Sequence, residues 1–131
     1  MIGPARDAAA IGMIVPPARG DVPPEAPSVY PEVRFLARGL GLNAMAPDDY
    51  ARVTDFVGDA AASLAAEGAA VVGVMGTSLS FFQGAGFNDQ MTDIVGRRSG
   101  RPASTMSTAI VRALRAFSPK RLAVLTAYED D

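Results

Sequence analysis

Residues 71–80 read Val71-Val72-Gly73-Val74-Met75-Gly76-Thr77-Ser78-Leu79-Ser80, an apolar run that ends in a small, hydroxyl-rich turn. Such a run is typical of a strand buried on both faces, and a Ser or Thr just after it is typical of a helix start. We therefore expect a strand over residues 69–75 and a helix from Ser78 or Ser80 to about Arg98. The turn between them presents backbone N–H groups and hydroxyls at one point, which suits a carboxylate or an enolate oxygen.

The same alternation of strands and helices continues on both sides of this stretch. Apolar runs predict further strands over residues 10–15, 33–40, 102–106 and 121–127. Amphipathic periodicity predicts helices over residues 47–67 and 107–117, and the segment 16–30, rich in Pro, Gly and acidic side chains, is expected to be a loop. This order implies an α/β fold with a mainly parallel sheet flanked by helices, whose ligands bind at the carboxyl ends of the strands.

The composition excludes several classes of protein. The chain has 131 residues, of which 49% are hydrophobic and 20% charged, as expected for a globular domain. A net charge of −2 argues against nucleic-acid binding, because no basic face is available to displace counterions from phosphates. The apolar run 8–15 is too short for a membrane span and lacks the flanks of a signal peptide. We therefore expect a cytoplasmic protein that binds neither membranes nor nucleic acids.

The chain contains no cysteine and no histidine. This excludes disulfides and thiolate zinc sites, and it removes the commonest metal ligand, so we expect no metal. Gly76–Ser80 nearly matches the nucleophile elbow G-x-S-x-G, but without histidine a Ser-His relay within the chain is excluded. A phosphate-binding loop is not supported, since no Gly-Lys-Ser/Thr follows. Two interpretations remain: a capped helix start, or an anion pocket made by Thr77, Ser78 and their amides.

Other candidates lie at the predicted carboxyl edge of the sheet. Pro16-Pro17 either simply end the first strand or form a rigid apolar wall beside the pocket. Tyr128 either packs against its neighbours or adds its hydroxyl to the same set of donors. The remaining candidates are better explained as helix caps or as core: Thr105, Ser107, Thr108 and the pair Phe81-Phe82.

The apolar strand predicted over residues 121–127 runs into Tyr128 and three acidic residues, where the sequence stops. In an α/β protein a helix normally follows and covers such a strand. We therefore divide the chain into an N-terminal α/β lobe over residues 1–119 and the first strand of a truncated second lobe over residues 120–131. On this interpretation the chain is a piece of a longer protein or needs a partner.

Separated segments of the chain resemble the arylmalonate decarboxylase family, within the aspartate/glutamate racemase superfamily. They are Gly12-Met13-Ile14-Val15-Pro16-Pro17, Met75-Gly76-Thr77-Ser78-Leu79-Ser80-Phe81, Thr105-Met106-Ser107-Thr108-Ala109 and Thr126-Ala127-Tyr128, with Gly-Leu-Gly-Leu at 39–42. Several matches in order are more specific than any one of them, and the similarity runs over nearly the whole chain. The resemblance implies the first lobe of a pseudo-twofold, two-domain racemase-like fold with its active site between the lobes.

The resemblance also implies roles for individual residues. Thr77, Ser78 and Tyr128 are similar to the side-chain donors of an oxyanion pocket, and Gly76 stands where related racemases carry a cysteine. Residues that fall where the family lines an apolar pocket are Pro16 (with Pro17 beside it), Leu42, Met45, Tyr50 and Leu79. The implied reaction is decarboxylation of an arylmalonate through an enediolate. It needs no cofactor, because the substrate supplies its own electron sink.

The cysteine that protonates the product in this family belongs to the second half, which the chain lacks. We therefore expect the 131-residue chain to be inactive alone and a missing C-terminal lobe to be its partner. One alternative is an amino-acid racemase or maleate isomerase-like member of the superfamily, which Gly76 disfavours. Another is a non-catalytic, truncated half-domain that binds carboxylates weakly.

Overall fold

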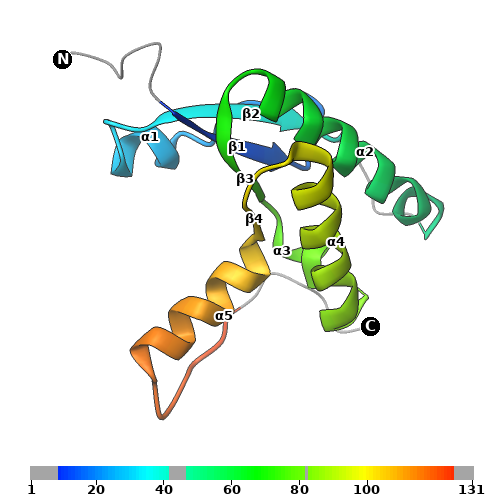
Figure 1. The fold of residues 1–131 in the computed structure, drawn as a ribbon. Coiled ribbons are helices and arrows are strands. Elements are labelled where there is room, and N and C mark those ends of the chain that lie inside the picture. Colours follow the sequence, from blue (N-terminus) through cyan, green and yellow to red (C-terminus); the bar gives the residue numbers. More distant parts are fainter. Residues whose placement is uncertain (1–8, 42–46, 82, 126–131) are drawn as a thin grey trace.

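The computed structural model describes residues 9–41, 47–81 and 83–125, with the segment 47–52 described by its backbone alone. The elements follow in the order β1 (Ala10–Val15), α1 (Glu25–Val29), β2 (Arg34–Gly39), α2 (Pro47–Ala66), β3 (Ala69–Val74), α3 (Thr77–Phe81), α4 (Gly84–Ser99), β4 (Ala103–Thr105) and α5 (Met106–Phe117) (Figure 1). The four strands form one sheet in the order β2-β1-β3-β4, and every neighbouring pair is parallel. The predicted α/β fold with a parallel sheet is therefore confirmed.

Helices α2 and α4 cover one face of the sheet and enclose the main core. The buried side chains of this core come mainly from β1, β3 and the two helices, with Leu79 added from α3, and include Ile14, Val53, Val57, Ala61, Leu64, Val72, Val74, Leu79, Phe87, Met91 and Val95. Gly12 makes the close packing possible, because a Cβ atom on it would lie 3.0 Å from the Cβ of Ala69 and 3.2 Å from that of Leu64. The core fixes the positions of β1 and β3, whose ends carry the candidate site.

The opposite face of the sheet has a smaller core. Met13 and Val15 of β1 and Ala37 of β2 are buried there, against Val22 and Ala26 from the connection between the two strands. Toward β3 the cover is incomplete, and Val71 is exposed. This second face is therefore open over part of the described structure.

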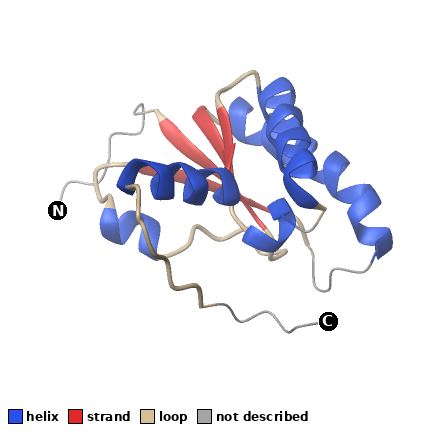
Figure 2. Cartoon of the chain, turned by 90° about the horizontal axis from the view of Figure 1, so that it is seen from below, coloured by secondary structure: helices blue, strands red, loops and turns tan. Residues whose placement is uncertain are grey.

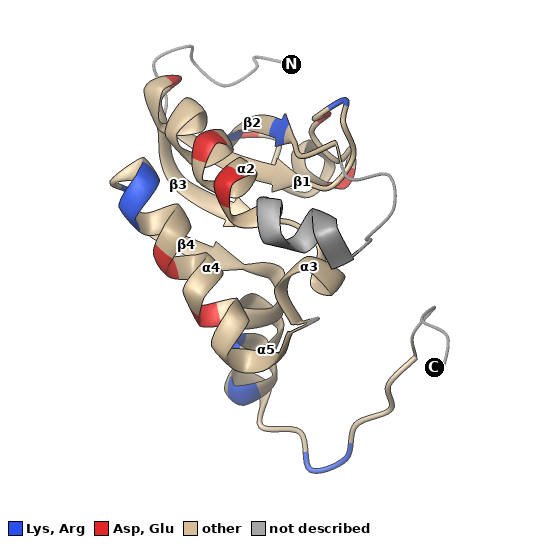
Figure 3. Cartoon of the chain, turned by 90° about the vertical axis from the view of Figure 1, so that its right-hand side faces the viewer, with Lys and Arg blue, Asp and Glu red and all other residues tan. Residues whose placement is uncertain are grey.

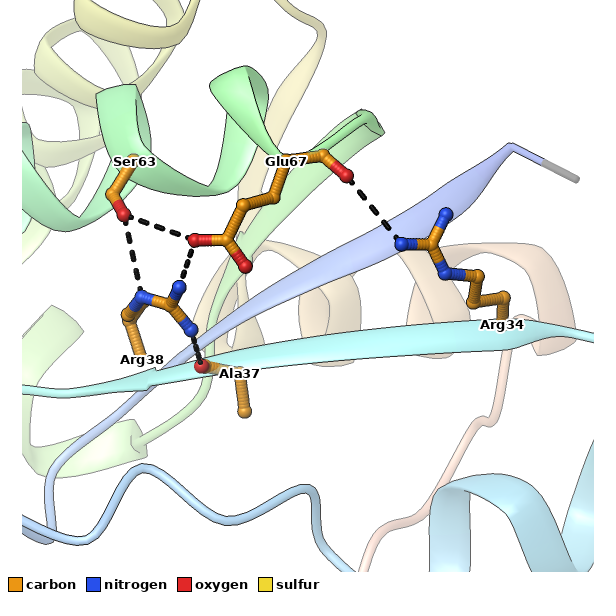
Figure 4. A network of polar contacts seen from close by, with 5 residues as sticks. All are labelled: Arg34, Ala37, Arg38, Ser63 and Glu67. Carbon is orange, nitrogen blue, oxygen red and sulfur yellow. Dashed lines mark hydrogen bonds and ion pairs between the residues drawn. The ribbon is translucent and has the colours of Figure 1, made fainter. Parts of the chain in front are cut away.

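The C-terminal end of α2 is attached to the edge strand β2 by a polar network (Figure 4). Arg38 pairs with the Glu67 carboxylate, donates to Ser63 Oγ at 3.3 Å, and donates to the Ala37 carbonyl at 2.8 Å. Arg34 donates to the Glu67 carbonyl at 3.5 Å. Because Arg34 and Arg38 lie on the same face of β2, they reach the same turn at the end of α2.

Helix α5 projects away from the body of the molecule and packs only its first part against α3 and β4 (Figure 1). None of its residues is buried, and Phe117 is 85% exposed. None of the described helices has the length and apolar character needed to cross a bilayer.

The strand predicted over residues 121–127 is not present in its described part. Residues 121–125 run as a loop beyond α5 (Figure 2). The side chain of Leu125 is 99% exposed. A strand is stable only beside a hydrogen-bonding neighbour, and no described strand lies along this segment. The division of the chain at residue 119 stays a prediction.

Three smaller expectations also need correction. The expected loop 16–30 contains the short helix α1, which tolerates Pro27 because first-turn N–H groups need no intrahelical acceptor. The helix expected from Ser78 to Arg98 is divided into α3 and α4, because Gly84 has a left-handed φ of 80°. Phe81, expected in the core, is exposed on the short α3, and Phe82 lies outside the described residues.

Candidate functional site

The turn after β3 and the turn after β1 lie side by side, because the two strands are parallel neighbours in the sheet. The Met75 N–H donates to the Ile14 carbonyl at 2.8 Å, which extends the pairing to the ends of both strands. A Cβ atom on Gly76 would lie only 3.0 Å from Cγ of Pro16. The sequence motifs around residues 16 and 76 therefore meet at the carboxyl edge, as expected for a ligand site in this kind of fold.

A hollow of about 1270 Å³ opens beside this meeting point. Its wall at the edge of the sheet is formed by Pro16, Pro17, Met75, Gly76 and Met106. From there the hollow extends along the second face of the sheet, over apolar side chains of β1, β2 and α1. The volume is large enough for a drug-sized aromatic ligand. Pro16 and Pro17 thus contribute to an apolar wall beside the turn.

Thr77 and Ser78 form the start of α3, where both residues are partly exposed. N–H groups in the first turn of a helix have no acceptor within the helix itself. Leu79, by contrast, is fully buried in the core under α4. Leu79 is not among the residues that line the hollow, because the third residue of α3 faces the core, and its expected place in an apolar pocket stays a prediction. Its Cδ1 atom would lie 3.4 Å from a Cβ on Gly76, so Leu79 supports the turn from beneath.

The remaining predicted site residues cannot be placed against this turn. Leu42, Met45 and Tyr128 lie outside the described residues, and only the backbone of Tyr50 is described, in α2. The structure therefore brings together Pro16, Pro17, Gly76, Thr77 and Ser78, and their roles stay predictions.

Two serines behind the turn were not recognised as part of the site from the sequence. The sequence favours a helix cap for Ser80, but its buried hydroxyl donates to the carbonyls of Gly76 and Thr77, at 3.1 Å each. It also contacts Ser107 Oγ at 2.6 Å. The available signal was the spacing of four residues from Gly76, at which a serine hydroxyl can bond back to a carbonyl.

The cap of α5 is Thr105, one of the three residues, with Ser107 and Thr108, for which the sequence favours a capping role. The Thr105 hydroxyl accepts from the N–H of Thr108 at 3.1 Å and donates to Asn88 Oδ1 at 2.5 Å. Asn88 in turn donates to Thr108 Oγ1 at 2.8 Å. These three side chains form a polar cluster that attaches the start of α5 to α4. Thr105 is therefore the helix cap, and Thr108 takes part in the hydrogen bonds that hold the first turn of the helix.

The turn itself carries no charged side chain. Among the described side chains of α2 and α4, every charged one is exposed, and Figure 3 marks their places along the two helices: Asp55, Asp59, Asp89, Asp93, Arg97 and Arg98. Near the hollow, the exposed pair Arg19–Asp21 lies at 3.0 Å on the outer rim. Within the described part of the chain, no cluster of acidic side chains is arranged to hold a metal ion. An anion at the turn would therefore be held by neutral donors.

A parallel sheet with a hydroxyl-bearing turn and an apolar hollow at its carboxyl edge defines an α/β domain with a candidate small-molecule site at that edge. The chain belongs to the arylmalonate decarboxylase family, whose model matches residues 11–131. The expected resemblance is thereby confirmed.

A curated relative and two solved structures support the same assignment. Arylmalonate decarboxylase from Bordetella bronchiseptica is 50% identical over 121 residues, which are 92% of this chain and 50% of the relative. A crystal structure of arylmalonate decarboxylase is 48% identical, with a TM-score of 0.83 over 92% of this chain and 50% of that chain. A structure of a glycine-to-cysteine mutant of arylmalonate decarboxylase, in a sulfate ion associated form, matches with a TM-score of 0.86 at 48% identity. The match covers 92% of this chain and 52% of that chain. The chain spans about half the length of these relatives.

Proposed function

We propose that this chain supplies the oxyanion-binding half of a cofactor-free arylmalonate decarboxylase. The observation that carries the proposal is the contact between the Gly76–Ser78 turn and Pro16 at the mouth of the hollow. Neutral donors lie on one side of this contact and apolar carbon on the other. A malonate carrying an aryl group needs both surroundings, one for the carboxylate that stays and one for the carboxylate that leaves.

In the proposed reaction, the bond between the α-carbon and the departing carboxylate breaks and CO₂ leaves. The bonding electron pair remains on the α-carbon and spreads onto the retained carboxylate, giving an enediolate, and onto the aryl ring. The amides and hydroxyls of Thr77 and Ser78, together with the Tyr128 hydroxyl, stabilise the developing charge on the oxygen. Donors directed at such charge lower the barrier most, because they are already oriented when the charge forms.

A proton must then reach the α-carbon, and the chain has neither cysteine nor histidine to deliver it. We assign the proton donor to a second lobe that packs against the open second face and α5. The exposed apolar residues of this region support such a partner: Val71, Ile110, Val111 and Phe117. The chain alone is expected to be inactive. Gly76 is proposed to leave one face of the enediolate without a proton donor, which distinguishes a decarboxylase from a two-sided racemase.

The test uses this chain joined to the second half of the family sequence, with phenylmalonate as substrate. Thr77→Val and Tyr128→Phe are each expected to lower turnover by about 100- to 1,000-fold, while circular dichroism and the thermal midpoint stay unchanged. Thr92→Val is the matched control, since Thr92 donates to the Asn88 carbonyl at 3.0 Å within α4, outside the lining of the hollow. Turnover at the parent rate in both site variants, or turnover by the 131-residue chain alone, contradicts the proposal.

A further inference from the structure

Behind the turn, Ser80 and Ser107 join two parts of the chain that are 27 residues apart. The carbonyl oxygens of Gly76 and Thr77 only accept, so the Ser80 hydroxyl must use its one proton on them. The 2.6 Å contact then has Ser107 as its donor and Ser80 as its acceptor. The direction of the whole chain of hydrogen bonds is fixed, from Ser107 through Ser80 to the carbonyls of the turn.

The Ser107 end of this series of hydrogen bonds is held by further contacts. The neighbouring residues Thr105 and Thr108 are tied to Asn88 of α4 by hydrogen bonds of 2.5 Å and 2.8 Å. Ser107 follows the capped start of α5, so the position of its hydroxyl is set by β4 and α4 together. A fixed anchor therefore lies at one end of the chain of hydrogen bonds and the site turn lies at the other.

Holding the carbonyls of Gly76 and Thr77 also orients the turn's N–H groups. Each peptide unit is planar, so a carbonyl drawn toward the interior sends the N–H of the same unit in the opposite direction. The peptide units concerned contain the N–H groups of Thr77 and Ser78. The buried hydroxyl of Ser80 thus directs these two N–H groups away from the interior.

We propose that Ser80 and Ser107 are a positioning pair for the anion-binding turn. The inference rests on the proposed function of that turn. Neither serine is assigned a contact with the substrate, so both act only through the orientation of the turn. Without the pair, the donors remain in the molecule but no longer hold one orientation. Catalysis by oriented donors is sensitive to such displacement, so turnover falls while substrate binding changes less.

The first test measures orientation without activity, by ¹⁵N relaxation of this chain. Ser80→Ala is expected to lower the order parameters of the Gly76, Thr77 and Ser78 amides from about 0.85 toward about 0.6. Ser99→Ala is the matched control, because Ser99 also donates to a carbonyl four residues earlier, that of Val95 at 2.6 Å, but within α4. The control is expected to leave the order parameters of the turn unchanged. Unchanged order parameters at the turn in Ser80→Ala overturn the proposal.

The second test uses phenylmalonate turnover in the enzyme that contains both halves. Ser107→Val removes the hydroxyl and Ser107→Thr keeps it in a side chain of the same shape, so the two variants are a matched pair. We expect kcat to fall roughly tenfold in the valine variant with little change in KM, and the threonine variant to restore it. Ser80→Ala combined with Ser107→Val is expected to be little worse than Ser80→Ala alone, since the serines act as one unit.

The outcomes distinguish a failure of the proposed function from a failure of the positioning role of Ser80 and Ser107. If the parent enzyme does not turn over phenylmalonate, the proposed function fails, while the relaxation measurement still decides whether the serines hold the turn. If the threonine variant is as slow as the valine variant, or if Ser99→Ala lowers kcat as much as Ser80→Ala does, the serines contribute only general stability and the positioning role is wrong.

Discussion

At Gly76 the backbone has a φ of 151°, and a side chain would meet Pro16 and Leu79. L-residues rarely adopt this conformation, and holding one there costs about 1–3 kcal/mol. We expect Gly76→Ala to lower the free energy of unfolding by about that amount, because the new methyl group also approaches Pro16 Cγ to 3.0 Å. Urea unfolding followed by circular dichroism measures the change.

Gly86 provides the control for this substitution. It lies in α4, has no positive φ, and a Cβ atom built on it has no neighbour within 4 Å. Gly86→Ala should therefore raise the free energy of unfolding by about 0.4–1 kcal/mol. A stabilising effect at Gly76, or equal effects at the two glycines, contradicts the assignment of a strained turn.

Single residues of the site were predictable where the signal is local. Gly76, Thr77 and Ser78 follow an apolar strand directly, and Pro16 follows another, so parallel pairing was enough to bring them together. The burial of Leu79 and the contact of Ser80 with Ser107 were not predictable. They depend on how the short α3 is rotated against α4 and α5, and no periodicity in the sequence reports that rotation.

At the scale of elements, the attachment of α2 to β2 depends on Arg38 and Glu67 (Figure 4). Their side chains are 40% and 39% exposed, so water screens the pair and limits its contribution to about 1 kcal/mol or less. We expect Arg38→Met to lower the free energy of unfolding by about 0.5–1 kcal/mol at low salt, and by less in 1 M NaCl, where charges are screened within about 3 Å.

A double-mutant cycle with Glu67→Gln isolates the pair from the other contacts of Arg38. The comparison pair is Arg98 with Asp59, which joins α4 to α2 but is 54% and 72% exposed. Its coupling energy should be smaller, about 0.5 kcal/mol or less. If the more exposed pair couples more strongly, or if salt has no effect on either pair, the network does not hold α2 by charge.

Whole elements were predicted best where a long apolar pattern fixes them. The buried strands β1 and β3 and the helix α2 have close to the expected bounds, since their apolar spacing extends over many residues. The helix α1 has one turn and contains Pro27, so it leaves no such pattern. The break between α3 and α4 depends on one left-handed glycine, whose conformation the sequence alone does not specify.

For the molecule as a whole, the predicted C-terminal strand and the described structure differ. A strand was expected over residues 121–127, whereas the described structure leaves residues 121–125 as a loop and exposes the apolar side of α5. Strand pairing is a long-range interaction. An apolar run therefore becomes a strand only when a neighbouring strand is present, and composition cannot supply that neighbour.

The exposed apolar side of α5 leads to a prediction for the chain in solution. Ile110 and Phe117 lie on one side of this helix, and both are exposed. Apolar patches of this kind promote association, so we expect the chain to self-associate in sedimentation velocity at micromolar concentration. Ile110→Asp should shift the distribution toward the monomer with a change in unfolding free energy of about 0.5 kcal/mol or less, because Ile110 is not buried.

Ala116→Asp adds the same charge to the same helix, about 120° around its axis from Ile110, and is expected to leave the association unchanged. The comparison separates the loss of an apolar contact from the gain of a negative charge. If both substitutions dissolve the assembly equally, charge repulsion explains the effect. If the parent chain is already monomeric, the α5 side is not an association surface in this chain, and the proposed second lobe would have to dock on the open face of the sheet.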